Sequence, residues 1–503
     1  MTSQIHLLPA IILSPFVGAL LLLFVPGDRW RAVRAVALLA ASVSLALSLA
    51  AAVLYNRAAG GMQFVERIPW VESFGIHLDL GVDGLSLPLV LLTAIILFAG
   101  VFVTWRLETR SKEFFIYALV LVGGVFGVFL SMDLLILFMF IEIAVIPKYV
   151  LISVWGSTRK EYAAMKYTMY LLAGSAISLV AIIAIFAYAH DPVRGLGAWT
   201  FDLATLSTIH FDPGFQKLAF FLMLAGFGVL VPLFPLHRWT PDGHSAAPTA
   251  ISMILAGVIM KLGGYALIRV GIGLFPQGAV FWAPVIAVLA AVNAVYIAFV
   301  AMVQKDLKFV VANSSISHMG FVLIGIASLN AASIDGAVAQ MFAHGIMAAL
   351  FFAIVGLVYD KAHTRVIDDF GGLAHQMPRV AAAFLIAGLA SLGLPGMFNF
   401  VAEFSVFSGA IQAFPVLAVV SISAVVVTAI YVLWVFQRMF FGPRNPKWDH
   451  LRDARGVEMV PIVVLAAVLI GFGLYPRAIM DVITGGILPL VQRVAALPAG
   501  GTL

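Results

Sequence analysis

The sequence predicts an all-α integral membrane protein of about fourteen transmembrane helices. Hydrophobic residues make up 63% of the chain, charged residues only 11%, and the mean hydropathy is +1.08. A soluble domain carries roughly 25% charged residues, so a chain of this composition could not cover its surface in water. Apolar stretches of about 20 residues recur along the whole chain, and this is the length a helix needs to cross a bilayer.

The predicted spans follow one another with no soluble domain between them. The N-terminal apolar stretch lacks the basic start and the small-residue cleavage site of a signal peptide, so we interpret it as a retained first span. Residues 477–497 are expected to form a short helix along the membrane interface. The fourteen spans are expected near residues 5–25, 33–55, 82–105, 114–130, 132–155, 163–189, 218–236, 248–270, 279–301, 307–327, 336–358, 381–412, 416–441 and 459–475.

Basic residues are distributed unevenly between the loops. The odd-numbered loops, counted from the N-terminus, hold far more Lys and Arg than the even-numbered loops and the two termini. Positive residues favour the cytoplasmic side, so an even number of spans places both termini outside, on the periplasmic side of a bacterial inner membrane. The net charge of +5 therefore reflects membrane-proximal loops and not nucleic-acid binding. The lack of Cys excludes thiolate-ligated iron–sulfur clusters, disulfides and Cys nucleophiles.

Two spans contain helix-breaking residues at corresponding positions. The seventh runs into VPLFPLHRWTPDGHSAAPT and the twelfth contains LPGMFNF, so we expect breaks near Pro232–Pro235 and Leu394–Phe398. The five-span offset is odd, which predicts two inverted five-helix repeats, as in many secondary transporters; ordinary Pro kinks are the alternative. The predicted units are residues 1–112 (helices 1–3), 113–275 (first repeat), 276–441 (second repeat) and 442–503 (helix 14 and tail).

Several titratable residues fall inside predicted spans, where a charge costs at least ~2.5–3.5 kcal/mol. They are Glu142 in the fifth span, Lys261 in the eighth, His318 in the tenth, His344 in the eleventh and Glu403 in the twelfth. A row of such groups would suit lateral proton transfer. Structural ion pairs between helices, or hydrogen-bonded packing for the histidines, are the alternatives. We expect Lys261 in the protein interior, near water or another titratable group.

Five sequence runs carry a family resemblance: GVDGLSLPL, FIEIAVIPKY, PLHRWTPDGHSAAPT, KDLKFVVANSSISHMGF and LPGMFNFVAEF. Together they resemble the proton-translocating antiporter-like subunits of NADH–quinone oxidoreductase (respiratory complex I), and among these the subunit M type. Related subunits occur in cation/proton antiporter complexes and membrane-bound hydrogenases. The likeness covers nearly the whole chain, and it is specific through the combination of motifs.

The resemblance implies a role for each matching residue. Glu142 corresponds to the family's glutamate of the fifth helix, Lys261 to its central lysine, and Glu403 to the glutamate that ends the proton path. His318 and His344 correspond to relay histidines, and Lys166 also matches a family lysine. The chain itself would bind no cofactor or metal. NADH, FMN, iron–sulfur clusters and quinone would belong to partner subunits, and neighbouring antiporter-like subunits and lipid would surround this chain.

The sequence departs from the family pattern at the position of Leu230. The family has a lysine there, which pairs with the glutamate matching Glu142. Smaller departures are Phe309 and Asn313, where Arg and Tyr are usual. Lys148 lies six residues after Glu142, about 9 Å along an ideal helix and about 120° around it. Because Pro147 can bend the helix, we hypothesise that Lys148 replaces the missing lysine; the alternative is that it extends to the lipid boundary or a neighbouring subunit.

Three functions remain open at this point. The resemblance favours a redox-driven proton-translocating subunit. A subunit of a sodium/proton antiporter complex without redox chemistry is one alternative, and a scaffold that has lost transport is another. Retention of Glu142, Lys261 and Glu403 together argues against the scaffold, whereas Leu230 argues for it in part.

Overall fold

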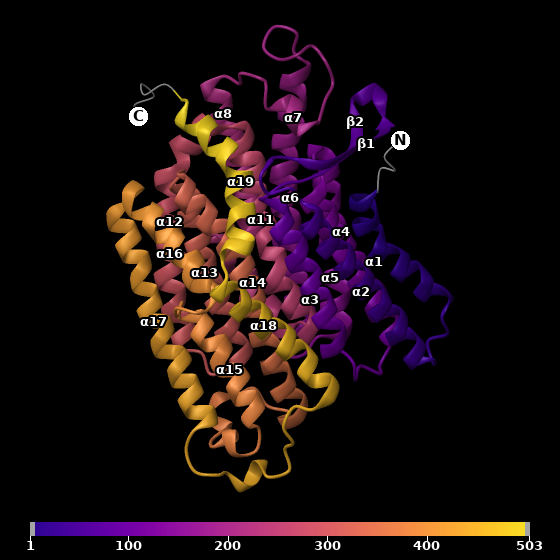
Figure 1. Cartoon of the computed structure of the whole chain (residues 1–503), viewed down its shortest axis with the longest axis vertical. Coiled ribbons are helices and arrows are strands. Elements are labelled where there is room, and N and C mark those ends of the chain that lie inside the picture. Colours follow the sequence, from indigo (N-terminus) through magenta and orange to yellow (C-terminus); the bar gives the residue numbers. More distant parts are fainter. Residues whose placement is uncertain (1–5, 498–503) are drawn as a thin grey trace.

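Long helices packed side by side make up most of the chain (Figure 1). The computed structural model describes residues 6–497. In this part, fourteen helices are long and apolar enough to cross a membrane, in agreement with the sequence prediction. The long helices of the N-terminal part are α1 (Leu7–Phe24), α2 (Trp30–Leu54), α3 (Ser86–Val103), α4 (Ser111–Leu130), α5 (Leu134–Trp155) and α6 (Lys160–His190).

A two-stranded antiparallel sheet between α2 and α3 is the main departure from an all-α fold. Strands β1 (Gln63–Val71) and β2 (Ile76–Val82) are joined through the short helix η1 (Glu72–Phe74) and Gly75, whose φ of +62° favours glycine. Neither strand is a long apolar stretch, and the sequence prediction therefore did not include them. The hairpin lies at the end of the bundle where the described chain also begins and ends (Figure 1).

The chain leaves its helical path near the predicted seventh-span break. After the short α7 (Leu203–Leu206), α8 (Pro213–Leu230) ends just before Pro232, which has no amide proton to donate. The 3-10 turn η2 (Leu236–Arg238) then leads into α9 (Trp239–Ala246). Side chains satisfy two of the carbonyls here: Asn293 donates to Pro232 at 2.9 Å and Trp239 to Val229 at 2.8 Å.

The eighth span contains two π-helical segments. Thr249–Ile272 consists of α10 (Thr249–Ile254), the π-helix η3 (Leu255–Ile259), α11 (Met260–Ala266) and the π-helix η4 (Leu267–Ile272). π-helical turns are rare and often occur at functional sites.

The rest of the chain is again mostly long helices. These are α12 (Pro276–Met302), α13 (Leu307–Ala327), α14 (Ala331–Ala362), α15 (Pro378–Ser391), α16 (Phe398–Ala413), α17 (Pro415–Phe440), α18 (Met459–Leu474) and α19 (Arg477–Ala495). Short 3-10 turns between them are η5 (Ile367–Asp369), η6 (Leu373–His375), η7 (Pro446–Trp448) and η8 (Gly456–Glu458).

The predicted twelfth span is divided between two helices. Helix α15 ends at Ser391 and α16 begins at Phe398, with Gly393 and Gly396 at positive φ between them. Neither half is as long as a full span, so the fourteen long helices include α19 in its place, although the sequence analysis set 477–497 aside as an interfacial helix. Counting α15 and α16 as one span and leaving out α19 gives the same number.

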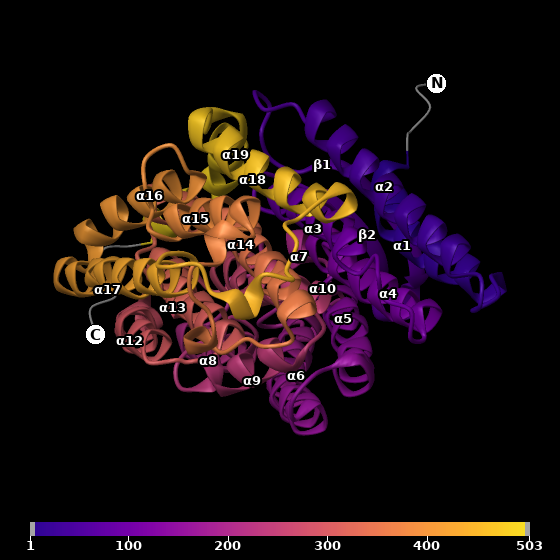
Figure 2. The ribbon, with the colours of Figure 1, turned by 90° about the horizontal axis from the view of Figure 1, so that it is seen from below.

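The most buried helices carry most of the titratable residues found by sequence. Within the described residues, the spans formed by Thr249–Ile272, α13 and α14 are almost entirely buried, whereas α2, α6 and α17–α19 expose much of their surface. Seen from below, α1 and α2 lie at one side, α17 at the other, and α14 near the middle (Figure 2). The fold therefore places Lys261, His318 and His344 away from lipid.

Candidate functional site

Lys261 lies halfway along the eighth span and has no exposed surface. Its ammonium donates to the carbonyl of Ala256 and lies 2.8 Å from Nδ1 of His344 on α14. Ala256 belongs to the π-helix η3, where the Met260 amide bonds to a carbonyl five residues back. The expectation that Lys261 sits in the interior beside another titratable group is therefore confirmed.

A row of buried titratable side chains extends from Lys261 through three further helices. The rings of His344 and His318 (α13) have their centroids 5.4 Å apart. Nε2 of His318 lies 3.9 Å from Oε1 of Glu403 on α16. All four residues are at most 5% exposed, and the structure brings them together in one row, with Lys261 from the first predicted repeat and the other three from the second.

His318 is flanked by acceptors on both sides of its ring. Nδ1 lies 2.8 Å from the carbonyl of Ser314, and Nε2 lies 3.2 Å from the carbonyl of Ser391. A neutral imidazole has one N–H and can donate to only one of these oxygens, whereas an imidazolium can donate to both. The site therefore offers hydrogen bonds to the protonated ring, as a relay group needs.

The break between α15 and α16 shapes the surroundings of Glu403. A Cβ atom on Gly393 would lie 2.3 Å from Oε2 of Glu403, so only glycine leaves room for the carboxyl group. Gln340 of α14 donates to Oε1 of Glu403 at 3.2 Å. Ser391, at the end of α15, supplies the carbonyl that faces His318. The interrupted helix thus contributes backbone directly to this row.

The first half holds Glu142 and Lys148 on α5, without direct contact between them. Lys148 is fully buried, so it reaches neither the lipid boundary nor an outer face. Its Nζ lies 5.3 Å from the ring centroid of Tyr167 on α6, a cation–π distance, and interacts electrostatically with Glu142. Among residues 6–497, Nζ of Lys148, Oε1 of Glu142 and the Tyr167 hydroxyl are buried without a hydrogen-bond partner.

His244 on α9 lies between the two groups, and the sequence analysis did not single it out. Its Nδ1 is 2.7 Å from the carbonyl of Thr240, while Nε2 is buried with no hydrogen-bond partner in the described chain. Tyr167 packs edge-on against Trp239 of the same short helix. The charges of Lys148 and Lys261 both act on His244. Its place inside the proline-rich PLHRWTPDGHSAAPT run was the signal that could have found it.

Lys166 and Leu230 lie apart from the row described above. Lys166 forms an ion pair with Asp242 of α9 at 2.6 Å, and both side chains are partly exposed. Leu230 is buried and faces Gly263 of α11. Asn313 donates to the carbonyl of Phe309 one turn earlier, so the two smaller departures from the family pattern contact each other.

Three basic residues are placed differently from the sequence expectation. Arg269, in the predicted eighth span, would extend toward the membrane surface if it followed the sequence pattern, but it is largely buried and pairs with Asp83 at 2.6 Å. Lys308 and Arg365 are among the basic residues that the sequence assigns to the odd-numbered loops, but they are less than 10% exposed and donate to the carbonyls of Ala247 and Ser245. Both cations thus stabilise the negative C-terminal end of α9, a role that loop counting could not reveal.

A second acidic group lies outside the spans, where α5 begins. Asp133 accepts hydrogen bonds from the amides of Leu135 and Ile136 and so caps α5. Burial raises the pKa of Asp133 to about 6, although these backbone hydrogen bonds oppose the change. Burial also raises the pKa of Asp79, with Arg67 acting in the opposite direction.

Metal-ligand spacing is not found in this site. Within residues 6–497, no group of three or more His, Asp or Glu side chains is arranged to hold a metal ion. The carboxyl, imidazole and amino groups of the row are groups that can bind and release protons.

Comparison with known proteins places the chain among membrane subunits of respiratory complexes. A family model described as NADH:quinone oxidoreductase/Mrp antiporter, transmembrane, matches residues 131–430. NAD(P)H-quinone oxidoreductase chain 4 1 of Synechococcus sp. is 40% identical over 481 residues, covering 93% of this chain and 89% of the relative. Chain 4 of Gloeobacter violaceus is 37% identical over 492 residues, with 96% and 92% covered.

Solved structures give the same fold. A chain of respiratory complex I from Thermus thermophilus superposes with a TM-score of 0.86 and 29% identity, covering 97% of this chain and 99% of that chain. A chain of the Mrp complex from Dietzia sp. has a TM-score of 0.85 at 19% identity, covering 98% and 100%. The second likeness concerns the fold alone.

Proposed function

The chain belongs to the NADH:quinone oxidoreductase/Mrp antiporter family of membrane proteins, and from this premise we propose that it is the proton-translocating antiporter-like subunit of an NADH–quinone oxidoreductase. The observation that carries the proposal is the buried row Lys261–His344–His318–Glu403. Its members contact one another or lie within 4 Å, apart from the two imidazoles, which are neighbours at 5.4 Å. The membrane domain of such a complex needs a row of this kind.

Protons would move along the row by successive transfers. The Lys261 ammonium gives a proton to Nδ1 of His344 and becomes a neutral amine. His344 passes a proton through a bridging water to the neighbouring ring of His318, because no hydrogen bond joins the two rings in the described chain. His318 then protonates Glu403, from which the proton leaves. Each transfer conserves charge and needs no redox group on this chain.

Redox chemistry would belong to partner subunits. NADH, FMN, iron–sulfur clusters and quinone would be bound there, and quinone reduction would drive the charge changes at Lys261. This chain would act as part of a translocase and carry no redox centre of its own. Its partners would be the other membrane subunits, including neighbouring antiporter-like subunits, with lipid around them.

The loop charges support a location in the bacterial inner membrane. The ends of the helices rich in Lys and Arg would face the cytoplasm, and both termini would face the periplasm. In Figure 1 the cytoplasmic end would be the lower one, below α15.

The breaks around Val231–Arg238 and Leu392–Met397 support the inverted-repeat arrangement proposed for residues 113–275 and 276–441. In the first repeat, Lys148 would take the place of the lysine that is absent at Leu230. Its full burial supports this, because a buried ammonium without a hydrogen-bond partner in the described chain requires water or a counter-charge, and Glu142 is the carboxylate that acts on it.

Proton pumping by the reconstituted complex tests the proposal. Lys261→Met removes the amino group but keeps much of the side-chain volume, so the complex should assemble and pumping should fall about 100-fold or more. The matched control is Lys217→Met, because Lys217 is exposed and only covers the Phe281 ring. Unchanged pumping per NADH in Lys261→Met would exclude the proposed function for this chain.

A further inference from the structure

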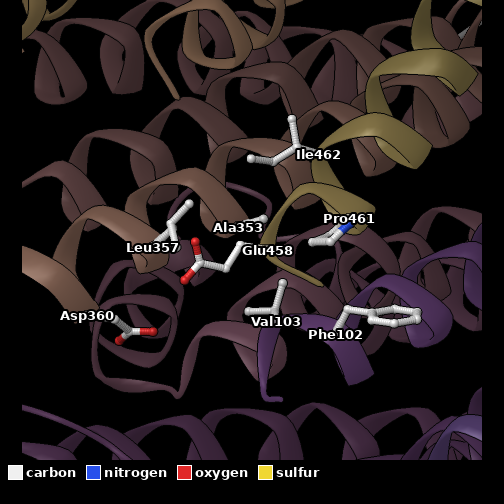
Figure 3. Close-up of a pocket in the computed structure, with 8 residues that line it drawn as sticks. All are labelled: Phe102, Val103, Ala353, Leu357, Asp360, Glu458, Pro461 and Ile462. Carbon is white, nitrogen blue, oxygen red and sulfur yellow. The ribbon is translucent and has the colours of Figure 1, made fainter. Parts of the chain in front are cut away.

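A small pocket opens between α3, α14 and α18 at the end of the bundle opposite the hairpin. Its volume of about 30 Å³ can hold a water molecule. Figure 3 shows the carboxylates of Asp360 and Glu458 toward one end of the pocket, with the apolar side chains Phe102, Pro461 and Ile462 at the other. Glu458 is held by Lys361 at 2.8 Å and by Arg106 at 2.9 Å. Asp360 makes no salt bridge within the described residues, so its carboxylate remains free to bind a proton.

Lys308 on α13 does not line this pocket, but it lies close enough to Asp360 for the two charges to interact. It is 3% exposed, and its ammonium donates to the carbonyl of Ala247 at 2.7 Å. No carboxylate of the described chain forms a salt bridge with it, although the charge of Asp360 acts on it. A buried ammonium with one hydrogen bond and no ion pair can give up a proton more readily than a paired one.

The packing of α14 places these groups in order. Gly356 contacts Thr249, at the start of the eighth span, and Asp360 lies one helical turn further along the same face. Gly345 contacts Gly257, one residue after the carbonyl that binds Lys261. Asp360 therefore lies at the level of the C-terminus of α9, where Lys308 binds, and His344 lies at the level of Lys261.

His244 lies between Asp360 and His344, as measured along the axis of α14. Its ring lies 5.9 Å from the ring of Phe352, which is eight residues from both Asp360 and His344, about 12 Å along α14 in each direction. Nε2 of His244 and Nε2 of His344 are both buried and lack hydrogen-bond partners in the part of the chain that the structure describes. Water between such atoms would complete a hydrogen-bonded path.

We propose that the Asp360 pocket is the inlet through which protons reach this chain, and that Lys308 and His244 carry them from there to Lys261. A proton from bulk water binds the Asp360 carboxylate. It then passes to the neutral amine of Lys308, which becomes an ammonium while Asp360 is ionised again. Lys308 returns to the amine as the proton moves through water to His244 and on to the neutral amine of Lys261. This inlet rests on the proposed function, because it supplies the row that ends at Glu403.

Lys308→Arg separates proton transfer from the capping of α9. A guanidinium keeps the charge and can donate to the Ala247 carbonyl, but it does not release a proton in a protein. We expect the complex to assemble with its quinone-reductase activity retained in the presence of an uncoupler, while pumping falls about tenfold or more. Wild-type pumping in Lys308→Arg would show that Lys308 only caps α9 and would overturn its part in the inlet.

Asp360→Asn tests whether the Asp360 carboxylate is the first group to accept a proton, and an added weak acid tests whether another carboxyl group can replace it. Without the carboxylate, pumping should be near normal at about pH 6 and reduced about fivefold or more at about pH 8, because protons are scarcer there. A small weak acid added on the inlet side should restore pumping at the higher pH. The matched control is Glu113→Gln, a partly exposed acid at the start of α4 that pairs with Arg110 outside the pocket. The other charged groups near Asp360 and Lys308 are Asp306, Arg365, Arg106, Glu458, Lys361 and His363.

His363 lies near Asp360 and could itself titrate between the two pH values. The same measurements are therefore repeated with each variant in a His363→Gln background. Normal pumping of Asp360→Asn at both pH values overturns the inlet, and so does a loss that no weak acid restores. Lys261→Met, measured alongside, separates the two proposals. If it abolishes pumping while Asp360→Asn and Lys308→Arg pump normally, the proposed function stands and the inlet lies elsewhere.

Discussion

The two halves of the candidate site hold similar groups in different states of contact. The second half of the site is the row Lys261, His344, His318 and Glu403, although Lys261 itself lies in the first sequence repeat; Lys261 and His344 are hydrogen-bonded, and the other members are close neighbours. In the first half, Glu142 and Lys148 occupy the same helix, are not in direct contact, and have buried polar atoms without partners in the described chain. Both halves combine an acid with a base, but Glu142 is partly exposed, whereas Lys148 and the four members of the row are buried.

This comparison shows where water has to contribute. Buried polar groups in native proteins are almost always hydrogen-bonded, and ordered water supplies the bond where protein does not. The second half has two gaps for water to bridge: one between the two imidazoles, and one between His318 and Glu403, which are 3.9 Å apart and not hydrogen-bonded. The first half needs water around Lys148, the Tyr167 hydroxyl and His244 before any proton can move. Hydration would therefore control the first half more strongly than the second.

Loss of the titratable group at Glu403 should have the largest effect on pumping. Glu403→Gln keeps the size of the side chain and its hydrogen bond with Gln340, but the amide cannot take up a proton. We expect pumping to fall about 100-fold while assembly is preserved. The matched variant is Gln340→Glu in the wild-type background, which adds a second acid beside Glu403 and should slow pumping without abolishing it. If Glu403→Gln pumps normally, the row of the second half is structural.

Replacement of Lys148 should reduce pumping less than replacement of Glu403. Lys148→Met should reduce pumping about tenfold, because Glu142 would lose the cation that acts on it. Adding Leu230→Lys places an ammonium on α8 where the family has it, and pumping should recover in the double variant. Pumping at the wild-type level in Lys148→Met would show that the first half works without a lysine or does not pump.

The number of helices and the second half of the site could be predicted from sequence. Length and hydropathy decide whether a helix spans a membrane, and these are properties of local sequence. Glu403 and Lys261 were identifiable because a charged residue inside an apolar stretch has a cost that must be offset. Their order along the row, however, depends on which helices pack together, and no local pattern reports that packing.

Other features could not be predicted because they depend on tertiary contacts. Lys308 looks like a loop charge, since it lies two residues from Asp306 near the end of a span, yet α13 places it under the C-terminus of α9. The pairing of Arg269 with Asp83 joins residues far apart in sequence. The hairpin β1–β2 is too short and too mixed in polarity to give a clear periodic signal.

The last prediction concerns the stability of the protein. It compares two aspartates that each cap a helix, Asp133 in the first repeat and Asp306 in the second. Asp133 caps α5, and Asp306 caps α13 by accepting from the Lys308 amide at 2.8 Å. Asp306 also pairs with Arg365 at 3.1 Å, whereas no cation is among the groups that act on Asp133 in the described chain. The two caps should therefore respond in opposite directions to the same Asp→Asn change.

The direction of the effect at Asp133 follows from its pKa, which burial raises from the usual carboxyl range to about 6 in the folded protein. The folded state holds the proton more tightly than the unfolded state, so stability falls as pH rises from about 4 to about 6 and then stays low. Asn caps a helix as well as Asp does and carries no charge, so Asp133→Asn should gain up to about 2 kcal/mol at neutral pH and nothing below about pH 4. Asp306→Asn leaves the mostly buried Arg365 without its partner and should lose about 1–3 kcal/mol. Thermal unfolding in detergent micelles across this pH range measures both. A loss of stability in Asp133→Asn at neutral pH would mean that the ionised carboxylate is stabilised in the folded protein, and the two caps would then be alike.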